Sequence, residues 1–219
     1  MKHALTVAFL ATLAGAASQA GQIDFQVLDK LGQPLPDAVV VLYPRKGEAA
    51  PVSPAPTVIE QEKMRFVPAL SVVPAGSHVR FTNLDRWDHH VKGGPDAMAA
   101  LTQAADTLPT SFELRLAGKV EGKPASAVEV TVNKPGTLIL GCHLHGSMRG
   151  HIFVTDSAWT LKTDEQGRAR FEQVPEGPVQ ARVWHAEELL EQPRQALQVT
   201  AAPLSQTVKL NVVPRRKRL

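Results

Sequence analysis

The protein has 219 residues, of which 43% are hydrophobic and 21% charged, with 15 glycines, 17 prolines, a single cysteine and a formal net charge of +3. This composition excludes intrinsic disorder and collagen-like structure, and one cysteine excludes an intramolecular disulfide framework. The small net charge does not indicate a nucleic-acid partner.

Residues 1–20 have the pattern of a secretory signal peptide. Lys2 precedes an apolar run over residues 4–14, and a small-x-small sequence at residues 18–20 places the mature N-terminus at Gly21. The run is too short to span a bilayer of ~30 Å, and no later segment reaches the ~20 apolar residues required, so no transmembrane segment is expected. We expect export to the periplasm, where an exposed thiol is oxidised unless it is buried, lipidated or bound to a metal.

Most of the mature chain is predicted to form short strands separated by turn residues. Strands are predicted where β-branched and apolar residues alternate or run together, at residues 22–28, 38–42, 77–81 and 128–132. The prolines argue against long helices, and a short helix is predicted between Asp96 and Ala105. The Ala- and Pro-rich residues 48–57 predict a linker or an exposed loop.

Two separated segments carry the turn chemistry of one fold. Residues 23–42 hold a strand, a Gly-Gln-Pro turn and a second strand, and residues 163–177 hold Thr-Asp-Glu-Gln-Gly followed by Val-Pro-Glu-Gly. Together they resemble the carboxypeptidase regulatory-like (transthyretin-like) β-sandwich, in which these pieces lie close in sequence. The resemblance implies a small sandwich formed by residues 21–47 and 158–213 with another domain inserted, which loop-closure entropy tolerates. Two unrelated strand–turn pieces are the alternative.

The segment after Gly141 carries three candidate metal ligands. Cys142, His145 and Met148 are spaced C-x₂-H-x₂-M, so one tight loop can bring a thiolate, an imidazole and a thioether to one ion. A blue-copper centre needs two histidines and one cysteine in a trigonal plane, with a weak axial methionine. The second histidine must therefore come from elsewhere in the chain, and the candidate is the segment at residues 83–91, which follows the predicted strand at residues 77–81 and contains His89 and His90.

The ligand motif and the segment before it resemble the cupredoxin family. The shared features are a Val-x-Phe-x-Asn strand that ends at Asn83, a His-x-Val sequence at residues 89–91 and the later Cys142 loop. The short C-x₂-H-x₂-M loop is most similar to that of amicyanin. The whole pattern resembles the amicyanin- and plastocyanin-like proteins of the methylamine utilisation type, and the resemblance covers about residues 64–154.

The cupredoxin resemblance implies a fold and a ligand set. It implies a Greek-key β-sandwich over residues 58–156, and hence an all-β protein in which this domain is inserted in, or packed beside, the second small β-sandwich. It also implies one copper ion that alternates between Cu(I) and Cu(II). The implied ligands are His89, Cys142, His145 and Met148.

Extra histidines leave this ligand set open. His90, His143 or His151 can replace Met148 as the fourth donor, or His90 can replace His89. Copper remains the expected metal, because structural zinc sites use cysteine and histidine without methionine and iron–sulfur clusters need about four cysteines.

Two neighbours of the first histidine are expected to support the site. Asn83 is expected to tie the His89 loop to the Cys142 loop by hydrogen bonds. Trp87 is expected to shield the metal or to pack against Met148, with a surface position as the alternative.

The cupredoxin resemblance implies an exported electron carrier rather than an enzyme. Such a carrier would be a monomer that exchanges single electrons with a redox protein, either a dehydrogenase or a cytochrome. The alternative is a periplasmic copper-binding or resistance protein that stores or delivers copper without redox cycling. A third interpretation is a structural, adhesion-like sandwich without copper function. The basic tail, residues 214–219, is expected to be solvated, although it could also touch a membrane surface or an acidic partner.

Overall fold

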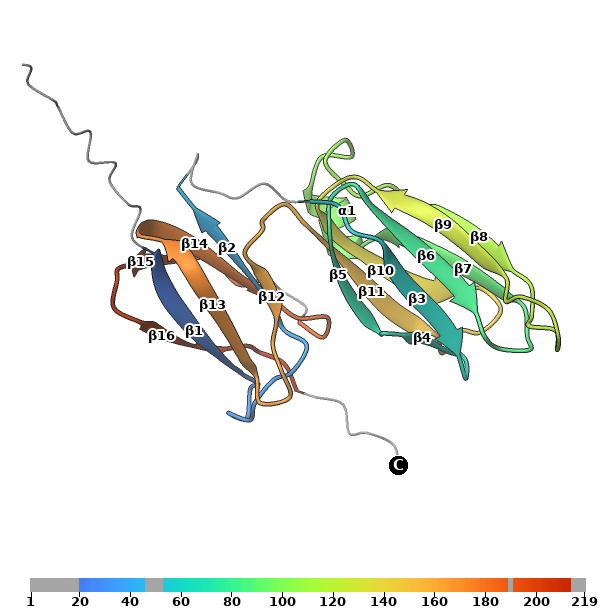
Figure 1. Cartoon of the computed structure of the whole chain (residues 1–219), viewed down its shortest axis with the longest axis horizontal. Helices are drawn as coiled ribbons and strands as arrows, with labels where there is room; N and C mark the ends of the chain where they lie inside the picture. The colour runs from blue at the N-terminus through green and yellow to red at the C-terminus, as the bar shows by residue number, and fades with distance from the viewer. Residues whose placement is uncertain (1–19, 46–52, 189–190, 214–219) are drawn as a thin grey trace, which may run out of the picture.

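The computed structural model describes residues 20–45, 53–188 and 191–213. Nearly all of the expected signal peptide, part of the expected linker and the basic tail lie outside the described residues. Within them the chain forms sixteen strands and one short helix, arranged as two β-sandwiches side by side (Figure 1). No helix among the described residues is long and apolar enough to cross a membrane. The predicted all-β class is confirmed.

The larger sandwich consists of a five-stranded and a four-stranded sheet. In spatial order the first sheet is β5 (Leu70–Pro74), β11 (Arg149–Thr155), β10 (Gly136–Cys142), β7 (His89–Pro95) and β8 (Phe112–Leu116). The second is β4 (Arg65–Val67), β3 (Thr57–Glu62), β6 (Ser77–Asn83) and β9 (Ala127–Val132). A helix, α1 (Ala97–Thr102), follows β7.

The smaller sandwich consists of a three-stranded and a four-stranded sheet. The first sheet is β13 (Arg168–Pro175), β1 (Ala20–Leu28) and β16 (Leu204–Lys209). The second is β12 (Thr160–Lys162), β2 (Val39–Pro44), β14 (Gly177–Trp184) and β15 (Gln195–Val199). The strands of the larger sandwich all lie between β2 and β12 in the sequence, so the smaller sandwich is built from two separated segments of the chain.

Side-chain and backbone hydrogen bonds join the two separated halves of the smaller sandwich. The Thr163 hydroxyl donates to Leu35 O and accepts from Ala38 N, and it is buried. Val27 N donates to Gly167 O at the tip of the β12–β13 turn. The two turn motifs recognised in the sequence therefore pair with each other, which is why the chain tolerates about a hundred inserted residues between them.

The predicted strands and helix are present with small changes in their bounds. In β6, side chains alternate between buried and exposed, as expected for a sheet with one face on a core. The helix begins after Asp96, whose carboxylate accepts from Met98 N, and it ends at Thr102 because Gln103 has an extended backbone. The helix is therefore shorter than the predicted segment.

The two sandwiches meet at a small apolar interface. Val39 and Val41 on β2 pack with Leu70 and Phe153 on the five-stranded sheet, and all four are buried. The Phe153 ring lies 5.3 Å from that of Trp184 on β14. This contact explains the uninterrupted apolar run in β2, which has one face on the smaller sandwich's core and the other on the larger sandwich.

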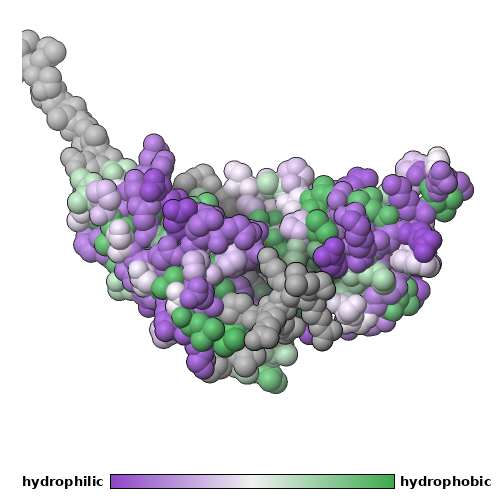
Figure 2. Space-filling view, turned by 90° about the horizontal axis from the view of Figure 1, so that it is seen from below, coloured by the Kyte–Doolittle hydropathy of each residue, from purple (hydrophilic) through white to green (hydrophobic). Residues whose placement is uncertain are grey.

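The surface differs from these interiors. On the face shown in Figure 2, hydrophilic residues predominate over the smaller sandwich, and hydrophobic residues lie in small groups over both bodies. The large apolar side chains are instead collected in two cores, one in each sandwich. The larger core extends to the end of the sandwich where β7 begins and β10 ends, and it includes Cys142.

Candidate metal centre

Antiparallel pairing of β7 and β10 brings the predicted ligands to one end of the larger sandwich. His89 is the first residue of β7 and Cys142 the last residue of β10, where it pairs with Val91. His143 N donates to His90 O at 2.9 Å, and this hydrogen bond ends the pairing of the two strands. The loop that follows returns His145 over this end, so three side chains from two distant parts of the sequence converge.

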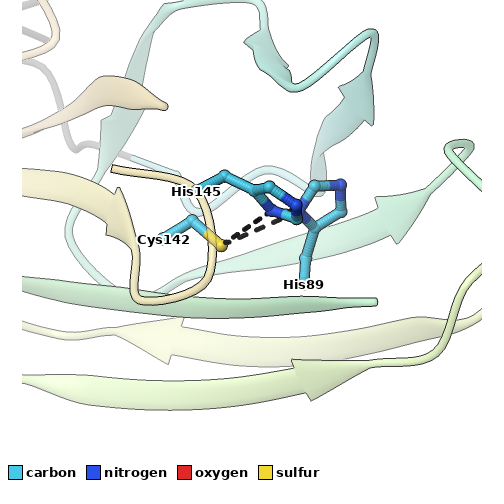
Figure 3. Close-up of side chains that lie close together, drawn as sticks. All are labelled: His89, Cys142 and His145. Atoms are coloured by element: carbon cyan, nitrogen blue, oxygen red, sulfur yellow. Dashed lines mark hydrogen bonds between the residues drawn. The ribbon is translucent and has the colours of Figure 1, made fainter. Parts of the chain in front are cut away.

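The donor atoms of His89, Cys142 and His145 form a nearly isosceles triangle (Figure 3). The Cys142 Sγ atom lies 3.7 Å from Nδ1 of His89 and 3.7 Å from Nδ1 of His145, and the two Nδ1 atoms are 3.2 Å apart. A point at the centre of this triangle is about 2.1 Å from each atom, which is the length of metal–nitrogen bonds and close to that of metal–sulfur bonds. The three side chains therefore fit one metal ion without rearrangement.

The donor triangle is largely withdrawn from water. His89 is 1% and Cys142 5% exposed, whereas His145 is partly exposed. Met148 is 1% exposed, belongs to the same apolar cluster as Cys142, and its backbone N–H donates to His145 O at 3.0 Å. A soft donor set of one thiolate, two imidazoles and a buried thioether nearby suits copper, and the tight turn fixes the backbone of the loop that carries it.

Asp85 holds the ring of His89. Nε2 of His89 lies 3.0 Å from Asp85 Oδ2, and an ionised carboxylate only accepts hydrogen bonds, so Nε2 carries the proton and Nδ1 keeps its lone pair toward Cys142. The Asp85 oxygens also accept from Lys63 N and Met64 N. Burial alone would raise the pKa of Asp85, but the hydrogen bonds from Met64, His89 and Lys63 outweigh it and lower that pKa below its ordinary value.

Asn83 plays a different part from the one predicted. It is fully buried, and its amide donates to Trp87 O and Ala117 O, while its carbonyl accepts from Asp85 N. Asn83 thus ties the His89 loop to the end of β8 rather than to the Cys142 loop. Trp87 is 45% exposed and stacks beneath the Arg86 guanidinium, which agrees with the surface alternative.

The other three histidines considered as ligands point elsewhere. His90 and His143 lie together beside Glu113, with their ring centroids 4.6 Å apart. His151 packs against Trp184 at the junction of the sandwiches. His89 rather than His90 is therefore the histidine whose ring nitrogen faces Cys142.

Sequence reasoning missed two residues, Asp85 and Glu113. Asp85 precedes His89 by four positions within the Asn-x-Asp sequence, so the spacing offered a weak local signal. Glu113 is 23 positions from His90, and only the pairing of β7 with β8 brings it close.

Comparisons with solved structures find similar chains among copper proteins. A Cu-containing nitrite reductase from Thermus scotoductus is 22% identical, with 59% of this chain and 28% of that chain covered and a TM-score of 0.37. A purple cupredoxin from Nitrosopumilus maritimus is 16% identical, covering 45% of this chain and 99% of the other at a TM-score of 0.33. Amicyanin from Paracoccus versutus is 24% identical, covering 54% and 99% at a TM-score of 0.32.

These similarities concern the fold alone. The chain spans little more than a quarter of the nitrite reductase. No protein-family model matches the chain, and no curated protein matches it. With TM-scores below 0.5, the neighbours carry neither a function nor a ligand set to this chain, and the chemistry of the site follows from its own atoms.

Proposed function

We propose that this protein is an exported mononuclear copper protein that transfers single electrons between redox partners. The observation that carries the proposal is the donor triangle of His89, Cys142 and His145, whose three atoms are spaced for one metal ion. When bound there, copper would supply one-electron chemistry by alternating between Cu(I) and Cu(II). The implied fourth ligand, Met148, is part of the proposal.

The residues around the triangle hold its donor atoms in place, which supports a site whose geometry changes little when the charge of its ion changes. His89 is held by Asp85, and Cys142 ends a strand that is paired on both sides. Donors that cannot relax keep one geometry for both oxidation states, so little reorganisation accompanies a one-electron exchange. A site used only for storage has no such requirement.

His145 is the proposed route by which electrons enter and leave. It is the one member of the triangle that is partly exposed, and its neighbour Leu144 is 59% exposed. An apolar side chain beside an exposed ligand edge gives a redox partner a surface from which water is readily removed. The partner is proposed to be another redox protein.

Voltammetry of the copper-loaded protein tests the proposal. Loaded with one equivalent of copper, a carrier should give a reversible one-electron wave and should retain that copper after many cycles, as measured by mass spectrometry of the metal. The Cys142→Ser variant is the matched control and should lack the reversible wave. Release of copper on reduction would contradict the electron-carrier proposal and would support storage or delivery instead.

A further inference from the structure

A second cluster of metal-ligating side chains lies beside the donor triangle. His90, Glu113 and His143 each offer one ligand atom, and these atoms lie within 4.8 Å of one another. Nε2 of His90 is 3.1 Å from one carboxylate oxygen of Glu113, and Nε2 of His143 is 3.4 Å from the other. We call these three residues the outer cluster.

The outer cluster is a geometric consequence of the same strand pairing that builds the triangle. Consecutive side chains in a strand point to opposite faces of the sheet. His89 faces the core, so His90 faces outward, and the bond from His143 N to His90 O sets these two residues side by side. The β7–β8 register, in which Glu113 pairs with Lys92, brings the carboxylate to the same outer face.

The outer cluster is open to solvent yet held in place. The side chain of His90 is 17% exposed, that of His143 40% and that of Glu113 62%. The two imidazole rings are tilted by 48° against each other, which restricts both. An ion can therefore reach the cluster from water, and water molecules can complete its coordination.

We propose that the outer cluster is a second metal site, which takes a divalent first-row transition ion through two imidazole nitrogens and one carboxylate. Ligand atoms on one such ion lie at most about 4.2 Å apart, and the exposed side chains of Glu113 and His143 can make the small adjustment needed. Nitrogen donors favour Cu(II) and Zn(II) over Mg²⁺ or Ca²⁺, and Cu(II) binds most tightly in the usual order.

The charges around the outer cluster support this selectivity. Lys92 and Arg115 lie across the β7–β8 ladder from Glu113 and His90, so the outer face has no excess of negative charge to attract hard cations. Binding must then rest on imidazole lone pairs, which hard cations do not prefer. The inference does not depend on the proposed electron-transfer function, because none of the outer ligands belongs to the triangle.

Zinc binding by protein already loaded with Cu(I) tests the second site. With Cu(I) occupying the thiolate-containing triangle, equilibrium dialysis against zinc sulfate at pH 7.5 should leave one zinc ion on each chain. Replacing a residue that only hydrogen-bonds to a metal ligand lowers metal affinity about 10–100-fold. Replacing a ligand itself, in Glu113→Gln or His143→Ala, should therefore lower zinc affinity at least about tenfold. Copper content should remain one per chain in both variants.

His78 provides the matched control. It is an exposed histidine on the four-stranded sheet of the same sandwich, and it lies 3.2 Å from Glu129 on the neighbouring strand. Among the described residues this histidine–carboxylate pair has no third ligand. His78→Ala should retain the zinc ion, and proton NMR should show zinc-dependent shifts of the His90 and His143 rings. Absence of zinc on the wild-type protein, or equal zinc affinity in wild type and Glu113→Gln, would show that the outer cluster is only a hydrogen-bonded surface group.

Discussion

At the scale of single residues, Asp85 fixes the orientation of the His89 ring and hence which ring nitrogen faces Cys142. Its oxygens accept from the His89 ring and from two backbone N–H groups, so it orients the ligand and also closes the β3–β4 turn. His89 is fully enclosed, which leaves its Nε2–H no water to bond. A change at Asp85 should therefore act on the metal through His89.

Asp85→Asn is expected to weaken copper binding about 10–100-fold, as is usual when the partner of a metal-bound histidine is altered. The neutral amide is a poorer acceptor and can present its NH₂ group to the ring. Competition with a chelator of known affinity measures the effect. Glu129→Gln, which alters the exposed His78 pair, is the control and should leave copper affinity unchanged. Equal copper affinities in the two variants would contradict the role of Asp85 in orienting His89.

At the scale of elements, the β12–β13 turn joins the two halves of the smaller sandwich. Gly167 has φ +71, and a Cβ placed there would lie 2.4 Å from Val27 O, the strand atom next to the turn. The turn thus needs glycine both for its backbone conformation and for the close approach of β1.

Gly167→Ala is compared with Gly122→Ala to separate these two requirements. Gly122 has nearly the same φ, +74, but a Cβ there would meet nothing within 4 Å. Gly122→Ala should cost only the strain of the conformation, about 1–2 kcal/mol, and Gly167→Ala more than about 3 kcal/mol because the backbone must also move apart. Urea unfolding measures both, and equal losses of stability would mean that the approach of β1 to the turn is not tight.

The elements also show which parts of the structure were predictable from sequence. Local patterns sufficed for the four predicted strands and for the short helix after Pro95, because alternation and turn residues are local signals. The C-x₂-H-x₂-M spacing and the strand before His89 sufficed to bring together His89, Cys142 and His145. Glu113 was not predictable, because strand register between β7 and β8 is set by packing rather than by any motif.

At the scale of the whole molecule, the junction of the two sandwiches contains a pair of half-buried histidines. His151 packs against Trp184 on β14, and His185 follows that residue in the chain. Burial lowers the pKa of both histidines below 6.5, and the negative charge of Glu187 opposes this shift at both. At His151 the charge of His185 lowers the pKa further, whereas the charge of Asp96 raises it. The junction is therefore built for uncharged imidazoles.

The stability of the protein should consequently depend on pH through this junction. The unfolded chain takes up protons at these histidines as the pH falls below about 6.5, whereas the folded chain takes them up only at lower pH, so stability is full above this range and is lost below it. Urea midpoints measured between pH 7.5 and pH 5 should fall in the wild-type protein. The His151→Gln/His185→Gln variant should show a flatter profile. A wild-type midpoint independent of pH would contradict the assignment.

The central claim is that His89, Cys142 and His145 hold one copper ion, and the visible spectrum tests it most directly. On addition of one equivalent of Cu(II), the purified protein should develop an intense thiolate-to-copper charge-transfer band that saturates at one ion per chain. Cys142→Ser and His89→Ala should abolish the band, and His90→Ala should retain it. A protein that binds copper without this band, or that loses the band only in His90→Ala, would contradict the claim.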